Sequence, residues 1–125
     1  MKTLRPSRFL TSLLAGALVT LSLSPVLAGA VGGPKHSGAQ TVQADGTDTY
    51  HIRFRGQEEA SVVAVAADGE DIDLDIYDED GDLIASDHDP DSTPVCLFTP
   101  DETQEYTIKV RNCMHHDVDY ALATN

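Results

Sequence analysis

The sequence predicts an all-β protein, folded as an antiparallel β-sandwich of seven or eight short strands. Apolar and polar residues alternate with period two through most of the chain after residue 42, and no segment in this region has a helical period. Turn-forming residues separate these segments at intervals of roughly 8 to 12 residues, as in sandwich domains. The length of 125 residues suits one domain with a modest core.

The first half of this region contains four predicted strands. Residues 49–55 alternate between apolar and polar side chains, as expected of a strand with one buried face. Residues 61–66 are almost all small and apolar, which indicates a strand buried on both faces. Aspartates alternate with isoleucine or leucine over residues 71–76, and a short strand follows at 82–86.

Three further strands are predicted at residues 95–99, 106–111 and 118–122. If the first two of these strands pair around the turn PDETQE, Cys96 lies opposite Cys113. We therefore expect a disulfide between these cysteines, provided that the compartment is oxidising.

The N-terminus has the pattern of a secretory signal peptide. Three basic residues, Lys2, Arg5 and Arg8, precede an apolar stretch at 9–23, which is shorter than the roughly 20 residues of a spanning helix. We expect cleavage after Ala28, with Ala30 as the alternative, so that residues 1–28 are the signal peptide. The product is expected to be secreted or periplasmic and not bound to the membrane.

The rest of the chain divides into two parts by composition. Residues 29–41 are rich in glycine and lack apolar periodicity, which predicts a flexible leader. Residues 42–125 are expected to form the β-sandwich domain.

The charge of the chain limits its partners. The 21 acidic residues outnumber the eight basic ones, and removal of the signal peptide leaves five basic residues and a net charge of −16. Binding to nucleic acid or to an anionic membrane is therefore not expected. Between Arg55 and Lys109 there are 17 acidic residues and no lysine or arginine.

The densest acidic segment predicts a hairpin. The residues DEDG at 78–81 suit a type I turn with Gly81 in the left-handed conformation, closed by Asp78 and Asp82. This register predicts that one face of the hairpin carries four carboxylates. These are the carboxylates of Asp71, Asp73, Asp87 and Asp89, with Asp73 opposite Asp87 and Asp71 opposite Asp89.

Two interpretations of these four aspartates remain open. Their mutual repulsion is relieved if they bind a calcium ion, which prefers oxygen ligands, or if they extend into solvent. An EF-hand is excluded, because its first ligand position would fall on Ile76.

The sequence does not predict an enzyme. His51 and Asp119 are a conceivable catalytic pair, but no serine has the context of a nucleophile elbow. His115, His116 and Asp117 are expected in a solvated loop, because adjacent residues on a strand point to opposite faces.

Five segments carry a resemblance to a known family. They are TYHIRFRG (49–56), SVVAVAA (61–67), DIDLDIYDEDGDLIASD (71–87), EYTIKVRN (105–112) and VDYALAT (118–124). Together they resemble the bacterial pre-peptidase C-terminal domain. The resemblance implies a jelly-roll-like β-sandwich of the kind attached to secreted peptidases, of which some related members bind collagen or calcium. The chain departs from the family in having no peptidase, in the cysteine pair, and at Gln104 and Glu105, where a glycine is frequent.

Two functions are consistent with these observations. The first is an exported, non-enzymatic binding or accessory module whose acidic face engages calcium or a basic or extracellular protein. The alternative is a structural or folding-assistant domain for a separately encoded secreted peptidase. An undetected hydrolase is a third hypothesis, which activity screening would test.

Overall fold

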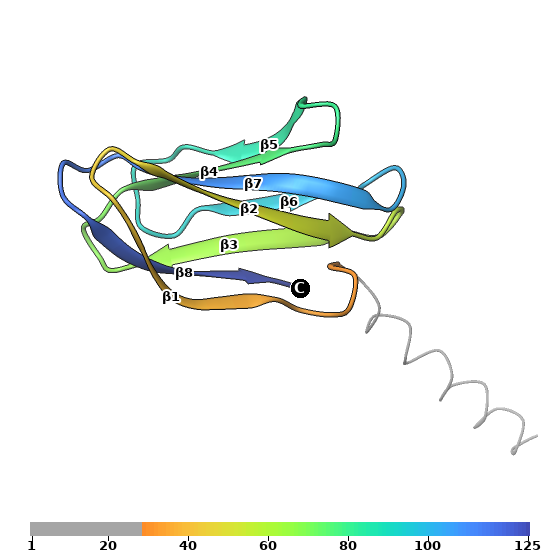
Figure 1. The fold of residues 1–125 in the computed structure, drawn as a ribbon, viewed down its shortest axis with the longest axis horizontal. Coiled ribbons are helices and arrows are strands. Elements are labelled where there is room, and N and C mark those ends of the chain that lie inside the picture. Colours follow the sequence, from red (N-terminus) through yellow and green to blue (C-terminus); the bar gives the residue numbers. More distant parts are fainter. Residues whose placement is uncertain (1–28) are drawn as a thin grey trace, which may run out of the picture.

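The computed structural model describes residues 29–125, so the expected signal peptide at 1–28 lies outside the described residues. The described part contains eight strands and confirms the all-β prediction (Figure 1). Their bounds are β1 His36–Val42, β2 Thr47–Phe54, β3 Ala60–Ala66, β4 Ile72–Tyr77, β5 Leu83–Asp87, β6 Val95–Phe98, β7 Gln104–Asn112 and β8 Val118–Thr124. Among residues 29–125 we find no helix with the length and hydropathy of a membrane span.

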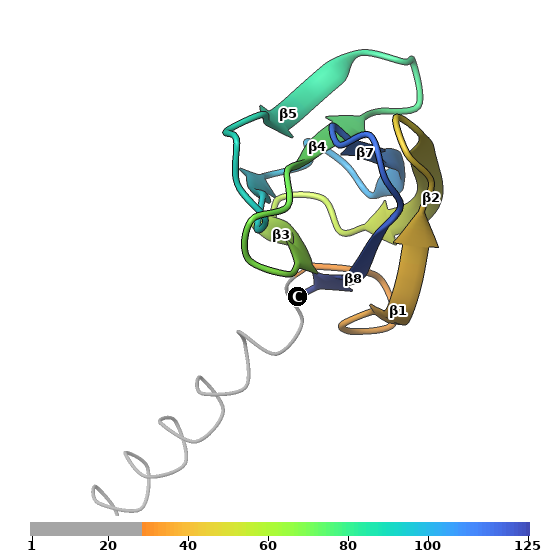
Figure 2. The same ribbon diagram turned by 90° about the vertical axis from the view of Figure 1, so that its left-hand side faces the viewer.

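The strands form two four-stranded antiparallel sheets that pack face to face as two layers (Figure 2). Sheet 1 has the order β1-β8-β3-β6, and sheet 2 has the order β2-β7-β4-β5. Within the described chain, β4 and β5 alone are consecutive and paired, because every other connection crosses from one sheet to the other. This connectivity gives the sandwich its jelly-roll-like character.

The core lies between the sheets and follows the predicted alternation. Phe54 of β2, Phe98 of β6 and Tyr106 of β7 pack edge-on or tilted, with ring centroids 5.0 to 6.0 Å apart. In β3, Val62 and Ala64 are completely buried, whereas Val65 on the opposite face is 48% exposed. The expectation that this strand is buried on both faces is therefore wrong for the described part of the chain.

The structure corrects the expectation that residues 29–41 form a flexible leader. Strand β1 pairs with β8, and Ala30 is buried where it forms a bridge to Phe54. The local sequence has no alternation because β1 is an edge strand, held by backbone hydrogen bonds rather than by buried side chains.

The predicted hairpin between β6 and β7 is also wrong. Strand β6 pairs with β3 in sheet 1, while β7 pairs with β2 and β4 in sheet 2. Cys96 and Cys113 consequently do not face each other, and both are free thiols. The segment between β6 and β7 is an arch that joins two sheets.

Asn112, at the end of β7, is a buried polar residue that ties the two sheets together. Its side-chain Nδ2 lies 2.8 to 3.2 Å from the carbonyl oxygens of Val42, Gln43 and His116, and its Oδ1 accepts a hydrogen bond from the backbone N–H of Met114. One side chain therefore orders both the β1–β2 and the β7–β8 connections.

We predict that Asn112→Asp destabilises the domain by about 3 kcal/mol, because the two N–H donors are replaced by a carboxylate that faces carbonyl oxygens. The volume of the side chain is unchanged, so a loss of packing cannot account for the result. Urea unfolding would measure the change, with Gln43→Ala on the exposed turn as the control. Equal stability of Asn112→Asp and wild type would contradict this role of the amide.

Candidate functional site

The acidic hairpin has the predicted turn but a different register beyond it. The backbone N–H of Asp78 donates to the carbonyl of Asp82, and Gly81 has φ of 85°, as expected. Tyr77 then pairs with Leu83, but Ile76 pairs with Ala85, so Ile84 is the extra residue of a β-bulge.

The bulge separates the four aspartates that the sequence placed on one face. Asp87 lies opposite Leu74, a core-facing residue, whereas Asp73 points to the outer face of sheet 2. The carboxylate of Asp87 reaches strand β6 and accepts a hydrogen bond from the backbone N–H of Val95 at 2.9 Å. The prediction that Asp73 faces Asp87 is therefore wrong by one residue of register.

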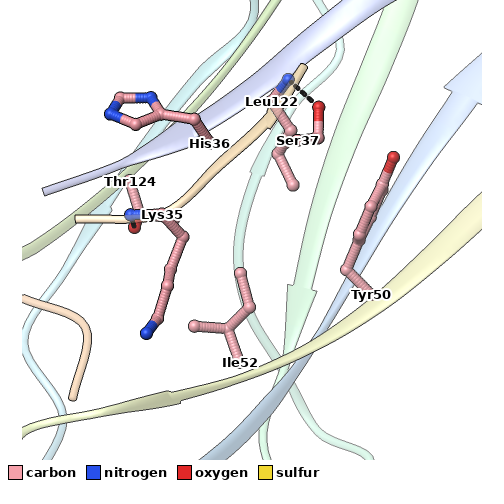
Figure 3. Close-up of a pocket in the computed structure, with 7 residues that line it drawn as sticks. All are labelled: Lys35, His36, Ser37, Tyr50, Ile52, Leu122 and Thr124. Carbon is pink, nitrogen blue, oxygen red and sulfur yellow. Dashed lines mark hydrogen bonds between the residues drawn. The ribbon is translucent and has the colours of Figure 1, made fainter. Parts of the chain in front are cut away.

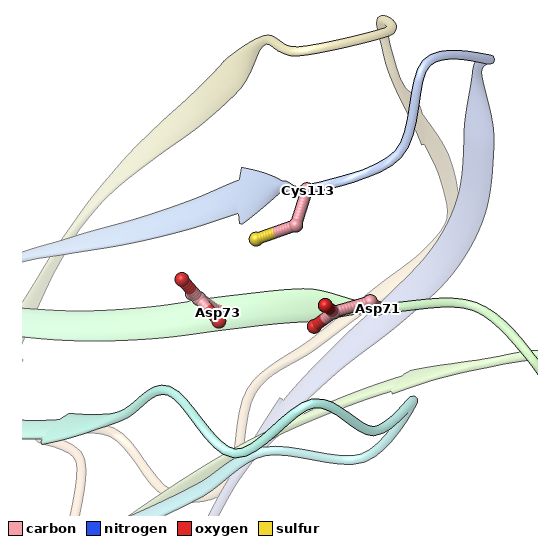
Figure 4. Close-up of side chains that lie close together, drawn as sticks. All are labelled: Asp71, Asp73 and Cys113. Atoms are coloured by element: carbon pink, nitrogen blue, oxygen red, sulfur yellow. The ribbon is translucent and has the colours of Figure 1, made fainter.

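Asp71 and Asp73 do come together, with Cys113 as the third member of the group (Figure 4). Asp73 is 4% exposed and forms an ion pair with Arg111, its neighbour on β7. Asp71 Oδ1 is a buried atom without a hydrogen-bond partner among the described residues. The thiol of Cys113 points toward these carboxylates (Figure 4).

Both thiols are held in the protonated form. Burial, followed by the hydrogen bond to Asp73 and the charge of that carboxylate, raises the pKa of Cys113 to about 11. Burial, followed by the charges of Asp87 and Asp75, raises the pKa of Cys96 to about 12. Neither thiol has the lowered pKa of a catalytic or metal-binding cysteine.

The acidic residues of β4 are balanced by the cations of β7. Asp73 lies beside Arg111, and Asp75 lies opposite Lys109, with a carboxylate oxygen 2.7 Å from Nε2 of the His88 ring. Among residues 29–125, the acidic residues around β5 form no such ion pair. We call this second group the acidic edge; it consists of Asp78, Glu79, Asp80, Asp82, Asp87, Asp89 and Asp91.

The acidic edge is ordered but electrically unbalanced. Asp78 and Asp87 use carboxylate oxygens to accept hydrogen bonds from nearby backbone N–H groups, which fixes the loops. No ion pair among residues 29–125 involves any of the seven residues. Asp80, Asp82 and Asp89 are exposed, so their charges face solvent or a partner.

The histidines do not assemble into one site. His115 contacts Asp45 and His116 contacts Glu70, at 3.0 and 2.8 Å. His51 lies on the outer face of sheet 2, beside Thr107, whereas Asp119 lies in sheet 1, so these two residues do not form a catalytic pair.

A small pocket of about 130 Å³ opens between the edge strands β1 and β2 (Figure 3). A bulge in β1 between His36 and Ala39 forms one wall, where the hydroxyl of Ser37 accepts a hydrogen bond from the backbone N–H of Leu122. Ile52 and Leu122 give it an apolar lining. This pocket was not predictable from the sequence, because the bulge depends on pairing with β8.

Tyr50, which also lines the pocket, belongs to a hydrogen-bonded chain between the sheets. Its hydroxyl lies 2.5 Å from that of Tyr120, which in turn donates to Asp48 at 2.7 Å. Burial and these two hydrogen bonds raise the pKa of Tyr120 far above its usual value. The hydroxyls are thus structural donors.

Together these features define an antiparallel, jelly-roll-like β-sandwich with one unbalanced acidic edge. No known family profile matches the sequence, and no curated protein sequence matches it significantly.

Solved structures do share the fold. The pre-peptidase C-terminal domain of collagenase from Bacillus anthracis is 14% identical, with a TM-score of 0.57 over 70% of this chain and 87% of that one. The resemblance to pre-peptidase C-terminal domains is confirmed at the level of the fold.

Two further structures with this fold are bacterial proteins of other kinds. The Yersinia pseudotuberculosis-derived mitogen is 15% identical, with a TM-score of 0.55 over 74% of this chain and 85% of that one. The periplasmic inhibitor of g-type lysozyme from Aeromonas hydrophila is 11% identical, with a TM-score of 0.55 over 74% and 84%. At these identities the likeness concerns the fold alone.

We predict that mass spectrometry without reduction finds two free thiols. Iodoacetamide at pH 8 should label native Cys113 about a hundredfold more slowly than a free cysteine, because the pKa of Cys113 lies about two units higher. The rate should rise about tenfold per pH unit up to the pKa. Asp73→Asn should accelerate labelling of Cys113, whereas Asp75→Asn on the same strand should not. A disulfide in the native protein would contradict the strand pairing.

Proposed function

We propose that this chain is an exported, non-enzymatic binding module whose acidic edge recognises a basic protein. The observation that carries the proposal is the unbalanced charge of the acidic edge, which persists although β7 supplies cations to the neighbouring strand. Fixed like charges on a rigid surface attract a partner of opposite charge and accelerate its association. The basic signal segment at the N-terminus and the fold shared with a periplasmic inhibitor support export.

We predict that the protein binds basic exported proteins, with g-type lysozyme as the first probe, and that the affinity falls as salt is raised. The triple change Asp80→Asn, Asp82→Asn and Asp89→Asn should weaken binding about tenfold or more, mainly by slowing association. Surface plasmon resonance against a panel of basic and neutral proteins would measure both quantities.

A charge-matched control separates the acidic edge from the net charge. Asp45→Asn, Glu59→Gln and Asp101→Asn also remove three exposed carboxylates, but from loops outside the edge. This variant should keep most of the affinity. If both triple variants bind equally well, the edge has no special role and the proposal fails.

An accessory role for a separately encoded secreted peptidase is the second candidate. The shared fold with the pre-peptidase C-terminal domain of a collagenase favours it. Recovery of a peptidase in stoichiometric amount with the protein from the periplasm or medium would support this role. Recovery of the protein alone would favour the self-sufficient binding module.

Calcium binding is a further proposal, although at a different place from the four aspartates that the sequence suggested. Carboxylate oxygens of Asp78, Asp80 and Asp82 lie within 4.8 Å of one another in the β4–β5 turn. Asp78 Oδ1 already accepts two backbone hydrogen bonds, so the three side chains would leave water to supply most of the six to eight oxygen ligands that calcium takes.

We predict that calcium at about a hundred times its dissociation constant stabilises the domain by roughly 2.7 kcal/mol, seen as a rise in melting temperature relative to chelator. Asp80→Asn with Asp82→Asn should abolish this rise, whereas Asp89→Asn with Asp101→Asn should keep it. An unchanged melting temperature in millimolar calcium would show that the turn is only solvated.

A further inference from the structure

The outer faces of the two sheets have opposite chemical character. Sheet 2 presents charged and polar side chains on its outer face, among them Arg53, Lys109 and Arg111. The outer face of sheet 1 carries the polar residues His36, Thr41, Ser61 and Asp119, but its other paired residues are apolar, and we call these the apolar face. They are Ala39, Val63, Val65, Val95, Leu97, Ala121 and Ala123.

Strand register makes the apolar face continuous. Val63 lies opposite Val95 on β6 and opposite Ala123 on β8, so that the band runs across neighbouring strands. Val65 pairs with Ala121, which in turn faces Ala39 on the edge strand β1. The next residues along these strands point into the core, which places this set on the outside.

The apolar face is accessible. Val65, Val95 and Leu97 are 48%, 43% and 58% exposed. A sheet with one face in water normally alternates apolar and polar residues, but β3 has valine on both sides. The run of small apolar residues in β3 is typical of a strand that is buried on both faces. In the described chain only the face with Val62 and Ala64 is completely buried, whereas Val65 on the other face is exposed.

The surroundings of the apolar face carry negative charge. Asp119 lies on the same side of sheet 1 as the apolar face, and it accepts a hydrogen bond from Thr41 at 2.6 Å. Exposed Asp68, Asp91 and Asp117 lie in the loops at the end where β3 stops and β8 begins.

The apolar face also adjoins the acidic edge. The hydrogen bond from the N–H of Val95 to Asp87 joins β6 of sheet 1 to β5 of sheet 2. A partner that covers Val95 and Leu97 therefore comes within reach of the carboxylates around β5.

We infer that the apolar face is the docking surface for a basic protein that presents an apolar patch surrounded by lysine or arginine. The inference rests on the proposed function in taking the partner to be basic. An apolar centre with a charged rim is the usual anatomy of a protein interface. A second copy of this chain is disfavoured, because each copy carries a net charge of −16 without the signal segment and would bring carboxylates against carboxylates.

Two synthetic strand peptides test this surface with the exported chain. One alternates lysine with leucine, and the other alternates lysine with serine at the same length and charge. The wild-type protein should bind the lysine–leucine peptide about tenfold or more tightly than the lysine–serine peptide, as measured by fluorescence anisotropy. Raising the salt concentration should lower the affinity for the lysine–serine peptide, whereas the ratio of the affinities for the two peptides should change less.

The double variant Val65→Thr with Leu97→Thr keeps residues that suit strands while removing apolar surface. It should bind both peptides with the weak affinity of the lysine–serine complex. The matched control Leu83→Thr with Ile84→Thr changes two hydrophobic residues of similar exposure on β5 and should bind as wild type does. Circular dichroism and thermal unfolding would verify that both variants are folded.

Each other outcome overturns the inference in a recognisable way. If wild type binds the two peptides equally, the proposal of a basic partner stands but the apolar face is not its docking surface. If wild type binds neither peptide, the proposed function fails as well. Equal loss in the β5 control would show that the contact is not specific to the apolar face. Sedimentation experiments would detect a dimer. If wild type is a dimer and the double variant Val65→Thr with Leu97→Thr is a monomer, a second copy covers the face.

Discussion

The buried side chain of Asn112 is the interaction on which the connectivity of the sandwich depends. The chain leaves sheet 1 after β1 and returns to it before β8, and Asn112 holds both crossings through contacts with Val42, Gln43, Met114 and His116. An amide has two N–H donors, so three nearby carbonyls share them. Because β1 and β8 pair directly while β7 lies in the other sheet, this one amide also fixes how the two layers meet at this end.

The strands that alternate in sequence were predictable, and the strand that does not alternate was missed. Residues 49–55 and 71–76 show their buried face directly, since every second side chain enters the core. Strand β1 buries little of its own side-chain surface and depends on β8, which lies some 80 residues away in the chain. Local composition therefore predicts a flexible leader at residues 29–41, although the pairing of β1 with β8 makes this segment part of the domain.

The acidic segment was predictable as a hairpin, but its side-chain arrangement was not. The residues DEDG specify the turn, yet the bulge at Ile84 shifts the next pairs by one residue and moves Asp87 to the other face. That bulge is compatible with the hydrogen bond from Val95 to Asp87, a contact between two sheets that no local pattern encodes. The disulfide prediction failed for a similar reason, because a short polar turn serves equally well for a hairpin and for an arch between sheets.

The separation of charge and apolar surface has a physical consequence for what this domain can contact. An uncovered apolar sheet face promotes self-association, and the unpaired edges of a sheet do the same. Here the strand that carries Val95 and Leu97 lies against the acidic edge, so two copies that approach through this face bring their carboxylates together. Like charge thus opposes contact between copies, while the same carboxylates attract a basic surface. In the complex that we propose, the acidic edge would select the partner and the apolar face would contribute the burial that holds it.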